Sequence, residues 1–407
     1  MGKLNPRQWA WCWYDWANSA FALVCMTALL PPLLVQAANR QLGAPAGTVA
    51  WGWLATAGLA ASLAVTPLLG AFMDSRAKRR QTLAVLIACG AVSCGLVGFF
   101  LDGHWLWAGL AYVLGATAFV LGNVAYDSLL VGIAPREELD QVSAWGYSLG
   151  YIGGALALIL ALALWRGGHT FWAFAAVGVW WAVFSLPLFA LVPEPPAGKP
   201  RPWQVLRESF ARLKQNPNAF RFLLAYWLYN DGIGTVIKMA GAYGGELGIP
   251  LAHLVGALLV AQLVGVPATL AFGWGARRLG CKRLILAALL VYLAVGLWGA
   301  RLSHAWEFWV LAVAVGLVQG GAQALSRSLF ARFVPAGAEA AFFSFFDVSA
   351  RLAGIAGPAV FSVATQLANS PRAGVLATTA FFLAGGWLLL RVAEPGEGDG
   401  LGETVKP

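Results

Sequence analysis

The sequence predicts an all-α integral membrane protein with twelve transmembrane helices, arranged as two six-helix bundles related by a pseudo-twofold axis. Three observations lead to this fold class. Of the 407 residues, 59% are hydrophobic and only 11% are charged, whereas soluble domains carry about 25% charged residues. Apolar stretches of the roughly 20 residues that a helix needs to cross a bilayer recur along the chain. One polar gap divides them into two equal sets, so a soluble enzyme, a nucleic-acid-binding protein and a disordered scaffold are excluded.

The apolar stretches form two groups of six. The first group covers residues 11–37, 49–73, 82–101, 105–133, 142–165 and 170–192. The second group covers residues 219–245, 251–275, 284–302, 306–331, 341–367 and 372–391. We therefore divide the chain into an N-terminal bundle (1–193), a linker (194–218), a C-terminal bundle (219–392) and a short polar tail (393–407).

The linker contains a predicted amphipathic helix. Apolar residues recur at spacings of three and four, as on one helical face: Trp203, Leu206, Phe210 and Leu213. The other face is basic, with Arg207, Arg212 and Lys214. A helix of this kind lies along a membrane surface. The alternative interpretation is a disordered linker.

Basic residues predict the orientation in the membrane. Twenty-one Lys and Arg residues, Arg327 and Arg332 among them, lie on the side of the linker, against four on the opposite side: Arg40, Arg166, Arg301 and Arg372. The positive-inside rule then places both termini and the linker in the cytoplasm. This distribution accounts for the net charge of +9 without a nucleic-acid partner. The first apolar stretch is too long for a cleaved signal peptide, and we expect the protein in a bacterial inner (plasma) membrane.

Two pairs of segments indicate that the halves arose by duplication. Residues 70–80 and 273–283 both begin with glycine and end in a short basic turn. Ser128, Leu129 and Pro135 recur as Ser328, Leu329 and Pro335, at a constant offset of 200. Span n therefore corresponds to span n+6, as in transporters with parallel repeats.

The segment with Gly70, Asp74, Lys78, Arg79 and Arg80 resembles the signature loop of the major facilitator superfamily. It departs from that signature at Ala77, where glycine is usual, and the second copy has Arg277 in place of the acid. Four further segments resemble the vacuolar effluxer-like branch of the superfamily: residues 14–21 (YDWANSAF), 150–154, 229–232 and 320–328. The resemblance extends over residues 8–392 and implies two six-helix bundles around a central cavity lined by spans one, four, seven and ten. It also implies that Asp74 contacts the other half to hold the cytoplasmic side shut. Fungal members are associated with amino-acid export from the vacuole.

Spans one, four and ten carry polar residues that predict a substrate or coupling site, because charges inside a membrane usually face a cavity or a partner. Asp15 and Asn18 share a helical face, as do Asn123 and Asp127, with Tyr126 adjacent. The repeat-related positions in span ten are Gln323 and Arg327. We predict that Asp127 and Arg327 pair across the two bundles. Alternatively, each pairs within its own half, and Asp15 caps or pins helix packing.

Span seven carries Asp231 near mid-membrane, beside Tyr229 and Asn230, with Lys238 two turns further on the same face. Two hypotheses stay open. If desolvation dominates, Asp231 binds and releases a proton during transport; if Lys238 dominates, the pair holds the two ends of a zwitterion, which we favour. Gln319 of span ten is a neutral hydrogen-bonding partner for the substrate. In span eleven, Asp347 and Arg351 at i and i+4 are interpreted as a structural intrahelical pair.

The sequence contains no Walker A motif and no metal-ligand spacing, so no cofactor, metal or enzyme activity is expected. We predict a secondary active transporter that moves a small polar metabolite, an amino acid in the first instance, by alternating access. The alternatives are an exporter of an amphipathic compound or lipid, and a non-transporting membrane sensor. The expected partners are a small-molecule substrate, membrane lipids and a coupling ion such as the proton. We expect a monomer.

Overall fold

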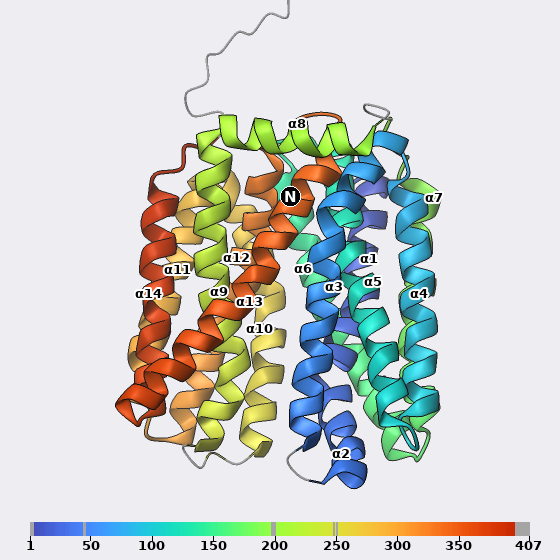
Figure 1. The fold of residues 1–407 in the computed structure, drawn as a ribbon. Helices are drawn as coiled ribbons and strands as arrows, with labels where there is room; N and C mark the ends of the chain where they lie inside the picture. Colours follow the sequence, from blue (N-terminus) through green and yellow to red (C-terminus); the bar gives the residue numbers. More distant parts are fainter. Residues whose placement is uncertain (1–3, 44–45, 197–200, 247–248, 250, 395–407) are drawn as a thin grey trace, which may run out of the picture.

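The computed structural model describes residues 4–43, 46–196, 201–246, 249 and 251–394. In these residues the chain forms helices and no strands. Helices α1 to α7 build one half and α9 to α14 the other, and α8 lies across one end of both (Figure 1). We call this end the α8 end. The prediction of an all-α membrane fold is confirmed.

The helix bounds follow the apolar stretches, with most helices a few residues longer. The N-terminal half contains α1 (Pro6–Phe21), a π-helix (Ala22–Ala28), α2 (Leu30–Leu42), α3 (Ala46–Arg76), α4 (Arg79–Phe100), α5 (Trp105–Ile133), α6 (Leu139–Arg166) and α7 (Thr170–Leu191). The C-terminal half contains α9 (Pro217–Glu246), α10 (Leu251–Leu279), α11 (Cys281–Gly299), α12 (Ala305–Ala331), α13 (Glu339–Ala368) and α14 (Pro371–Leu390).

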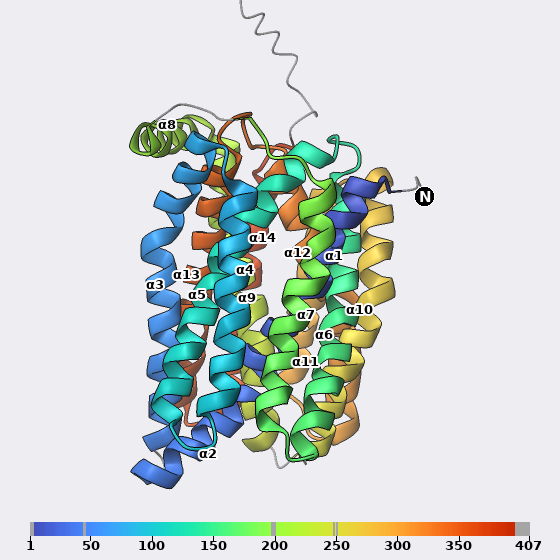
Figure 2. The same ribbon diagram turned by 90° about the vertical axis from the view of Figure 1, so that its right-hand side faces the viewer.

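Ten helices in the described part are long and apolar enough to cross a membrane, and eleven if the first, bent pair is one span. That pair, Pro6–Ala28 and Leu30–Leu42, bends by 42°. The bend follows from the wide π turn and from Pro31 and Pro32, which have no N–H to donate to the preceding turn. The remaining member of the expected twelve is α9, which runs through the bundle with the others but carries charged residues (Figures 1 and 2).

The amphipathic helix predicted in the linker is α8 (Pro202–Gln215). The predicted apolar stripe is divided between two surroundings: Leu213 is buried and Leu206 packs against the protein, beside the buried Val205 and Ser209, whereas Trp203 and Phe210 are 69% and 47% exposed. Val205 packs against Ala71 of α3 and Ala341 of α13. Since α3 and α13 belong to different halves, α8 covers a junction between them.

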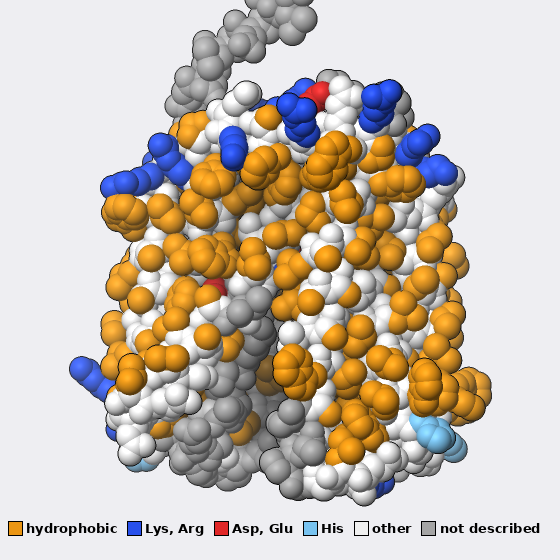
Figure 3. All heavy atoms as spheres, viewed as in Figure 1, with side chains coloured by type: hydrophobic (Ala, Val, Ile, Leu, Met, Phe, Trp, Pro, Cys, Tyr) orange, Lys and Arg blue, Asp and Glu red, His pale blue; other side chains and the backbone are white. Residues whose placement is uncertain are grey.

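Lys and Arg side chains gather at the α8 end, above a broad hydrophobic band (Figure 3). Two residues that the sequence analysis placed in this basic set have another role. Arg327 is 3% exposed and Arg79 is 2% exposed, because both lie between the halves rather than on the surface. The four opposite residues, beginning with Arg40, lie near helix ends away from α8.

The turns that end α3 and α10 each contain a residue with positive φ directly after the helix. Ala77, between α3 and α4, has φ of 50°, and Gly280, between α10 and α11, has φ of 83°. Both are left-handed, a conformation in which the Cβ of an L-residue is strained and glycine is not. Glycine would therefore fit position 77 without strain, and it is the residue that the resembling signature loop usually has there.

Replacing Ala77 with glycine is therefore expected to stabilise the protein. Glycine removes the strain of the left-handed conformation from the folded state, and it raises the conformational entropy of the unfolded chain. The first effect is larger, so the free energy of unfolding should increase by about 0.5–1 kcal/mol. Denaturation of the purified protein in detergent measures the change. The control is Ala88→Gly at an exposed position inside α4, expected to destabilise by about 1 kcal/mol. Destabilisation by both substitutions would contradict the strain argument.

Candidate functional site

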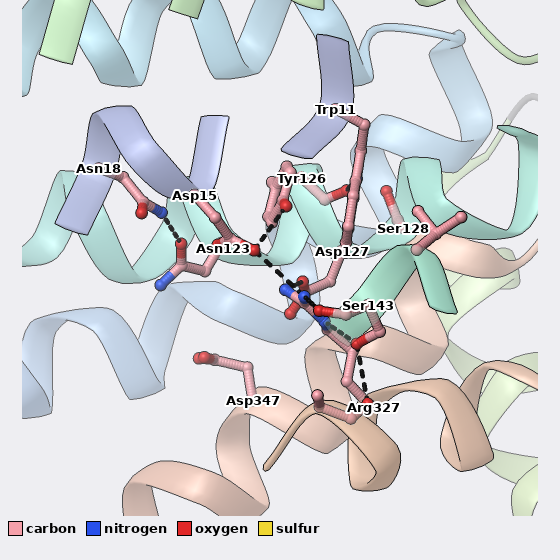
Figure 4. A network of polar contacts seen from close by, with 12 residues as sticks. Trp11, Asp15, Asn18, Asn123, Tyr126, Asp127, Ser128, Ser143, Arg327 and Asp347 are labelled. Atoms are coloured by element: carbon pink, nitrogen blue, oxygen red, sulfur yellow. Dashed lines mark hydrogen bonds and ion pairs between the residues drawn. The ribbon is translucent and has the colours of Figure 1, made fainter. Parts of the chain in front are cut away.

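Arg327 of α12 binds three helices of the other half at once (Figure 4). Its Nη1 lies 3.1 Å from Asp127 Oδ1 on α5, and its Nη2 lies 3.1 Å from Asp15 Oδ2 on α1. Its Nε donates to Ser143 Oγ on α6 at 2.9 Å. The predicted contact between Asp127 and Arg327 across the bundles is therefore present. Asp15 shares the same guanidinium, which the sequence analysis did not anticipate.

Aromatic rings surround the Arg327 guanidinium. Its central carbon lies 4.6 Å from the ring centroid of Trp11 and 4.5 Å from that of Tyr147. Trp11 in turn stacks on Tyr126 at 4.3 Å. A cation held against ring faces in a desolvated site gains electrostatic stabilisation from each ring. The sequence analysis missed Trp11, Tyr147 and Ser143. Trp11 lies one helical turn before Asp15, a spacing that could have identified it.

Further hydrogen bonds orient the acidic and amide side chains. Tyr126 donates its hydroxyl to Asp15 Oδ2 at 2.8 Å. Asn18 Nδ2 donates to Asn123 Oδ1 at 2.9 Å and joins α1 to α5. Asn123 and Asp127 share a face of α5, as their spacing predicts (Figure 4).

Gly146 of α6 allows this network to close. A Cβ at this position would collide with Asp15 Oδ2 and lie 3.0 Å from Arg327 Nη2. Gly150, one helical turn further along α6, faces Ser19 of α1 in the same way. The small residues of α6 therefore bring α1 close enough for Asp15 to reach α12.

A second inter-half contact lies at the end of α3. Asp74 is 1% exposed and accepts hydrogen bonds from the backbone N–H groups of Ala340 and Ala341 at 3.0 and 2.8 Å. These groups belong to the first turn of α13, where the helix dipole favours a carboxylate. Gly70, one turn earlier, faces the Ala340 carbonyl with no room for a Cβ.

Arg79 completes this contact, with Nη2 2.6 Å from Asp74 Oδ1 and 2.5 Å from Glu339 Oε2. Lys78 is exposed, and Arg80 donates to the Phe189 carbonyl of its own half. Of the five loop residues selected from the sequence, Gly70, Asp74 and Arg79 reach the other half, whereas Lys78 and Arg80 do not.

The repeat-related contact joins α10 to α6. Arg277, the counterpart of Asp74, donates to the Gln141 side chain, and Gly273 faces Ala144. Asp140 of α6 binds Arg332 of the other half at 2.6 Å and accepts from Ser328 Oγ at 2.6 Å. The sequence analysis did not select Asp140.

Two glutamates cap repeat-related helices. Glu194 accepts from the backbone N–H groups of Arg79 and Arg80 at the start of α4, at 2.6 and 2.9 Å. Glu394 accepts from the Lys282 N–H at the start of α11, at 2.7 Å. The signal was available in the sequence, because the two glutamates are 200 residues apart and each precedes a proline.

The residues selected in span seven lie apart from Arg327. Asp231 is 1% exposed, and its Oδ2 accepts from the Gly357 N–H of α13 at 2.8 Å. Tyr229 is buried and shares a 2.6 Å hydrogen bond with Ser326. Asn230 is half-buried. The Lys238 side chain lies outside the described residues, so its predicted pairing with Asp231 remains a prediction.

Gln319 and Gln323 are partly exposed on α12, two turns and one turn before Arg327. Asp347 and Arg351 form the predicted i, i+4 pair, with Oδ1 and Nη2 3.2 Å apart.

Two helical halves joined through buried charge pairs define a transporter of the major facilitator class. The fold matches the human organic anion transporter MFSD10 (TETRAN), with a TM-score of 0.78 and 18% identity over 95% of this chain and 100% of that chain. It also matches the proton:xylose symporter XylE, with a TM-score of 0.76 and 12% identity over 96% of both chains. At these identities the likeness concerns the fold alone.

Sequence relatives identify the family. The family model described as "Vacuole effluxer Atg22 like" matches residues 133–396. The MFS-type transporter YxiO of Bacillus subtilis (strain 168) is 31% identical over 97% of this chain and 96% of its own length. Autophagy-related protein 22 of Yarrowia lipolytica is 29% identical, but the match covers only 50% of that protein and 62% of this chain. The chain belongs to the Atg22-like effluxer family of major facilitator transporters, and its relatives are transporters rather than enzymes.

Proposed function

We propose that the protein is a monomeric secondary transporter that exports an amino acid across the bacterial inner membrane by alternating access. The observation that carries the proposal is the binding of Arg327 by α1, α5 and α6 of the opposite half. The basic α8 end, with both chain termini, is the cytoplasmic side. The halves close there, and substrate passes when these contacts open and those at the other end form.

The contacts at the α8 end are suited to opening and closing. They include charge pairs and helix-end hydrogen bonds around Asp74, Asp140 and Arg327. Water can take over such polar contacts when the halves separate, whereas an apolar interface would resist separation.

The charges around Arg327 favour coupling to a proton. Asp15 and Asp127 share one guanidinium, so ionisation of both carboxyl groups leaves an excess negative charge in a desolvated site. Asp15 also accepts a hydrogen bond from the Tyr126 hydroxyl, so two partners hold it in this site. Asp127 is therefore the group that takes up and releases the proton. We prefer it to Asp231, whose carboxylate receives a backbone hydrogen bond from α13.

Transport by purified protein in proteoliposomes tests this function. Amino-acid counterflow is measured for a panel of amino acids, with an internal pH dye and a parallel assay with an amphipathic fluorescent dye. We expect amino-acid counterflow and substrate-driven proton movement, with proton movement lost in Asp127→Asn. Asp102→Asn, in an exposed loop, is the control and should leave both unchanged. Transport of the amphipathic dye alone, or of neither substrate, would contradict the proposal.

A further inference from the structure

The Asp347–Arg351 pair of α13 has features that a purely structural pair lacks. Asp347 Oδ1 meets Arg351 Nη2 at 3.2 Å, and the two side chains are 11% and 22% exposed. Asp347 Oδ2 and Arg351 Nε are buried without a hydrogen-bond partner among the described residues. Buried charged groups normally have their remaining polar atoms satisfied, because desolvation is otherwise uncompensated. An incompletely satisfied pair indicates that further polar groups complete it.

The pair lies deeper in the molecule than the contacts that close the α8 end. Asp347 and Arg351 are 8 and 12 residues from the start of α13 at Glu339, or about 12 and 18 Å along the helix axis. Arg327 is only 4 residues from the end of α12 at Ala331, or about 6 Å. Since a hydrocarbon core is about 30 Å thick, Arg351 is close to mid-membrane. Transporters bind their substrates near this depth.

Neutral polar groups occur at the same depth on neighbouring helices. Gln323 and Gln319 are 8 and 12 residues from the end of α12, the same axial distances as Asp347 and Arg351. Asn123 of α5 is 10 residues from the end of its helix at Ile133. All three amides are partly exposed. Asp347 lies across from Asp127 and Asn123 (Figure 4), and α5 and α13 are in contact. This polar layer is separated from the α8 end by the Arg327 network.

We propose that Asp347 and Arg351 bind the charged head of an α-amino acid, with Arg351 holding its carboxylate and Asp347 its ammonium group. The inference rests on the proposed function and assigns the residues that would bind its substrate. An α-amino acid carries both charged groups on one carbon atom, which matches an acid and a base that lie next to each other. The planar guanidinium binds a carboxylate through two parallel hydrogen bonds. The amides of Gln319, Gln323 and Asn123 remain for the substrate side chain.

Binding selectivity tests the assignment independently of transport. A thermal-shift screen of the twenty amino acids against the wild-type protein first identifies the best ligand. Its dissociation constant is then compared with those of its decarboxylated amine and its N-acetyl derivative, in wild type, Asp347→Asn and Arg351→Gln. Ser362→Ala, exposed on the same helix, is the matched control.

We expect Arg351→Gln to reduce the preference for the amino acid over the amine roughly 10- to 100-fold. Asp347→Asn should reduce the preference over the N-acetyl derivative by a similar factor, and Ser362→Ala should change neither. If Arg351→Gln does not fold, Arg351→Lys, which retains the charge without the fork, should show a smaller loss of carboxylate preference. Unchanged preferences in variants that still bind the amino acid would overturn the assignment and leave the proposed function standing. No amino-acid binding by the wild-type protein would overturn both.

Discussion

Replacing Arg327 with glutamine is expected to lower the rate of transport at least about 100-fold, the largest effect of any single substitution considered. The change leaves the Asp15 and Asp127 carboxylates between the halves without their shared cation. Breaking a buried ion pair on one side costs about 3–5 kcal/mol. Closure of the α8 end depends on this contact, so the loss of the ion pair destabilises the closed state. Initial transport rates in proteoliposomes measure the effect, and Arg301→Gln, at an exposed position, should behave as wild type.

Double-mutant cycles measure separately how strongly Asp127 and Asp15 are coupled to Arg327. Coupling of Arg327 with Asp127, and separately with Asp15, is expected to be about 1–3 kcal/mol in each cycle, since both carboxylates contact the guanidinium directly. Exchanging the charges of Asp127 and Arg327 should restore part of the activity that each single change removes. Coupling of zero in both cycles would show that the contacts in Figure 4 do not govern transport.

Asp74→Asn is expected to reduce transport about 10- to 100-fold, with membrane insertion and substrate affinity nearly unchanged. The carboxylate accepts two backbone N–H groups of α13 and binds Arg79. Asparagine has one acceptor oxygen and no charge, so it loses at least one of these hydrogen bonds and the ion pair, each worth about 1–3 kcal/mol. The closed state at the α8 end becomes less populated as a result.

A native thiol reports this opening. Cys281 is fully buried, and its Sγ lies 2.9 Å from Asp140 Oδ1 of the other half. Opening should therefore expose Cys281 to a maleimide reagent, and we expect faster labelling in Asp74→Asn. Cys94 is also buried but packs in the core of the N-terminal half, so its labelling should stay slow. If Cys281 is labelled at the same rate in Asp74→Asn as in the wild type, and transport is also unchanged, the loop that contains Asp74 would serve only to orient the protein in the membrane.

Several elements of the site could be derived from residue spacing. The repeat offset of 200 relates Asp127 to Arg327, and these two side chains meet at 3.1 Å. The signature-like loop identified Asp74, which does contact the other half. Asp15 was selected from the sequence, but its contact with Arg327 could not be predicted, because the two are 312 residues apart and no periodicity links them.

Other expectations depended on helix rotation and were incomplete for that reason. Spacing identified a helix in the linker, but only Leu206 and Leu213 of its apolar stripe turn toward the protein, beside Val205 and Ser209, whereas Trp203 and Phe210 are exposed. A surface helix contacts both lipid headgroups and protein, and hydrophobicity alone does not distinguish the two neighbours. The depth of Asp231 suggested a cavity position, whereas the residue is buried against α13 at Gly357.

The sequence alone was enough for the fold class and for the approximate extent of most helices, because both depend on local hydropathy and on the thickness of a bilayer, but it did not show the break between α1 and α2. It also identified most of the charged residues between the halves, since charges within apolar stretches are rare. Only the tertiary structure showed that Asp15 and Asp127 share Arg327, that Asp140 pairs with Arg332, and that the Asp347–Arg351 pair lies deeper than these contacts. These relations depend on how each helix is rotated and how closely glycines such as Gly146 allow its neighbour to approach. Packing of the whole bundle determines both, and no single helix contains that information.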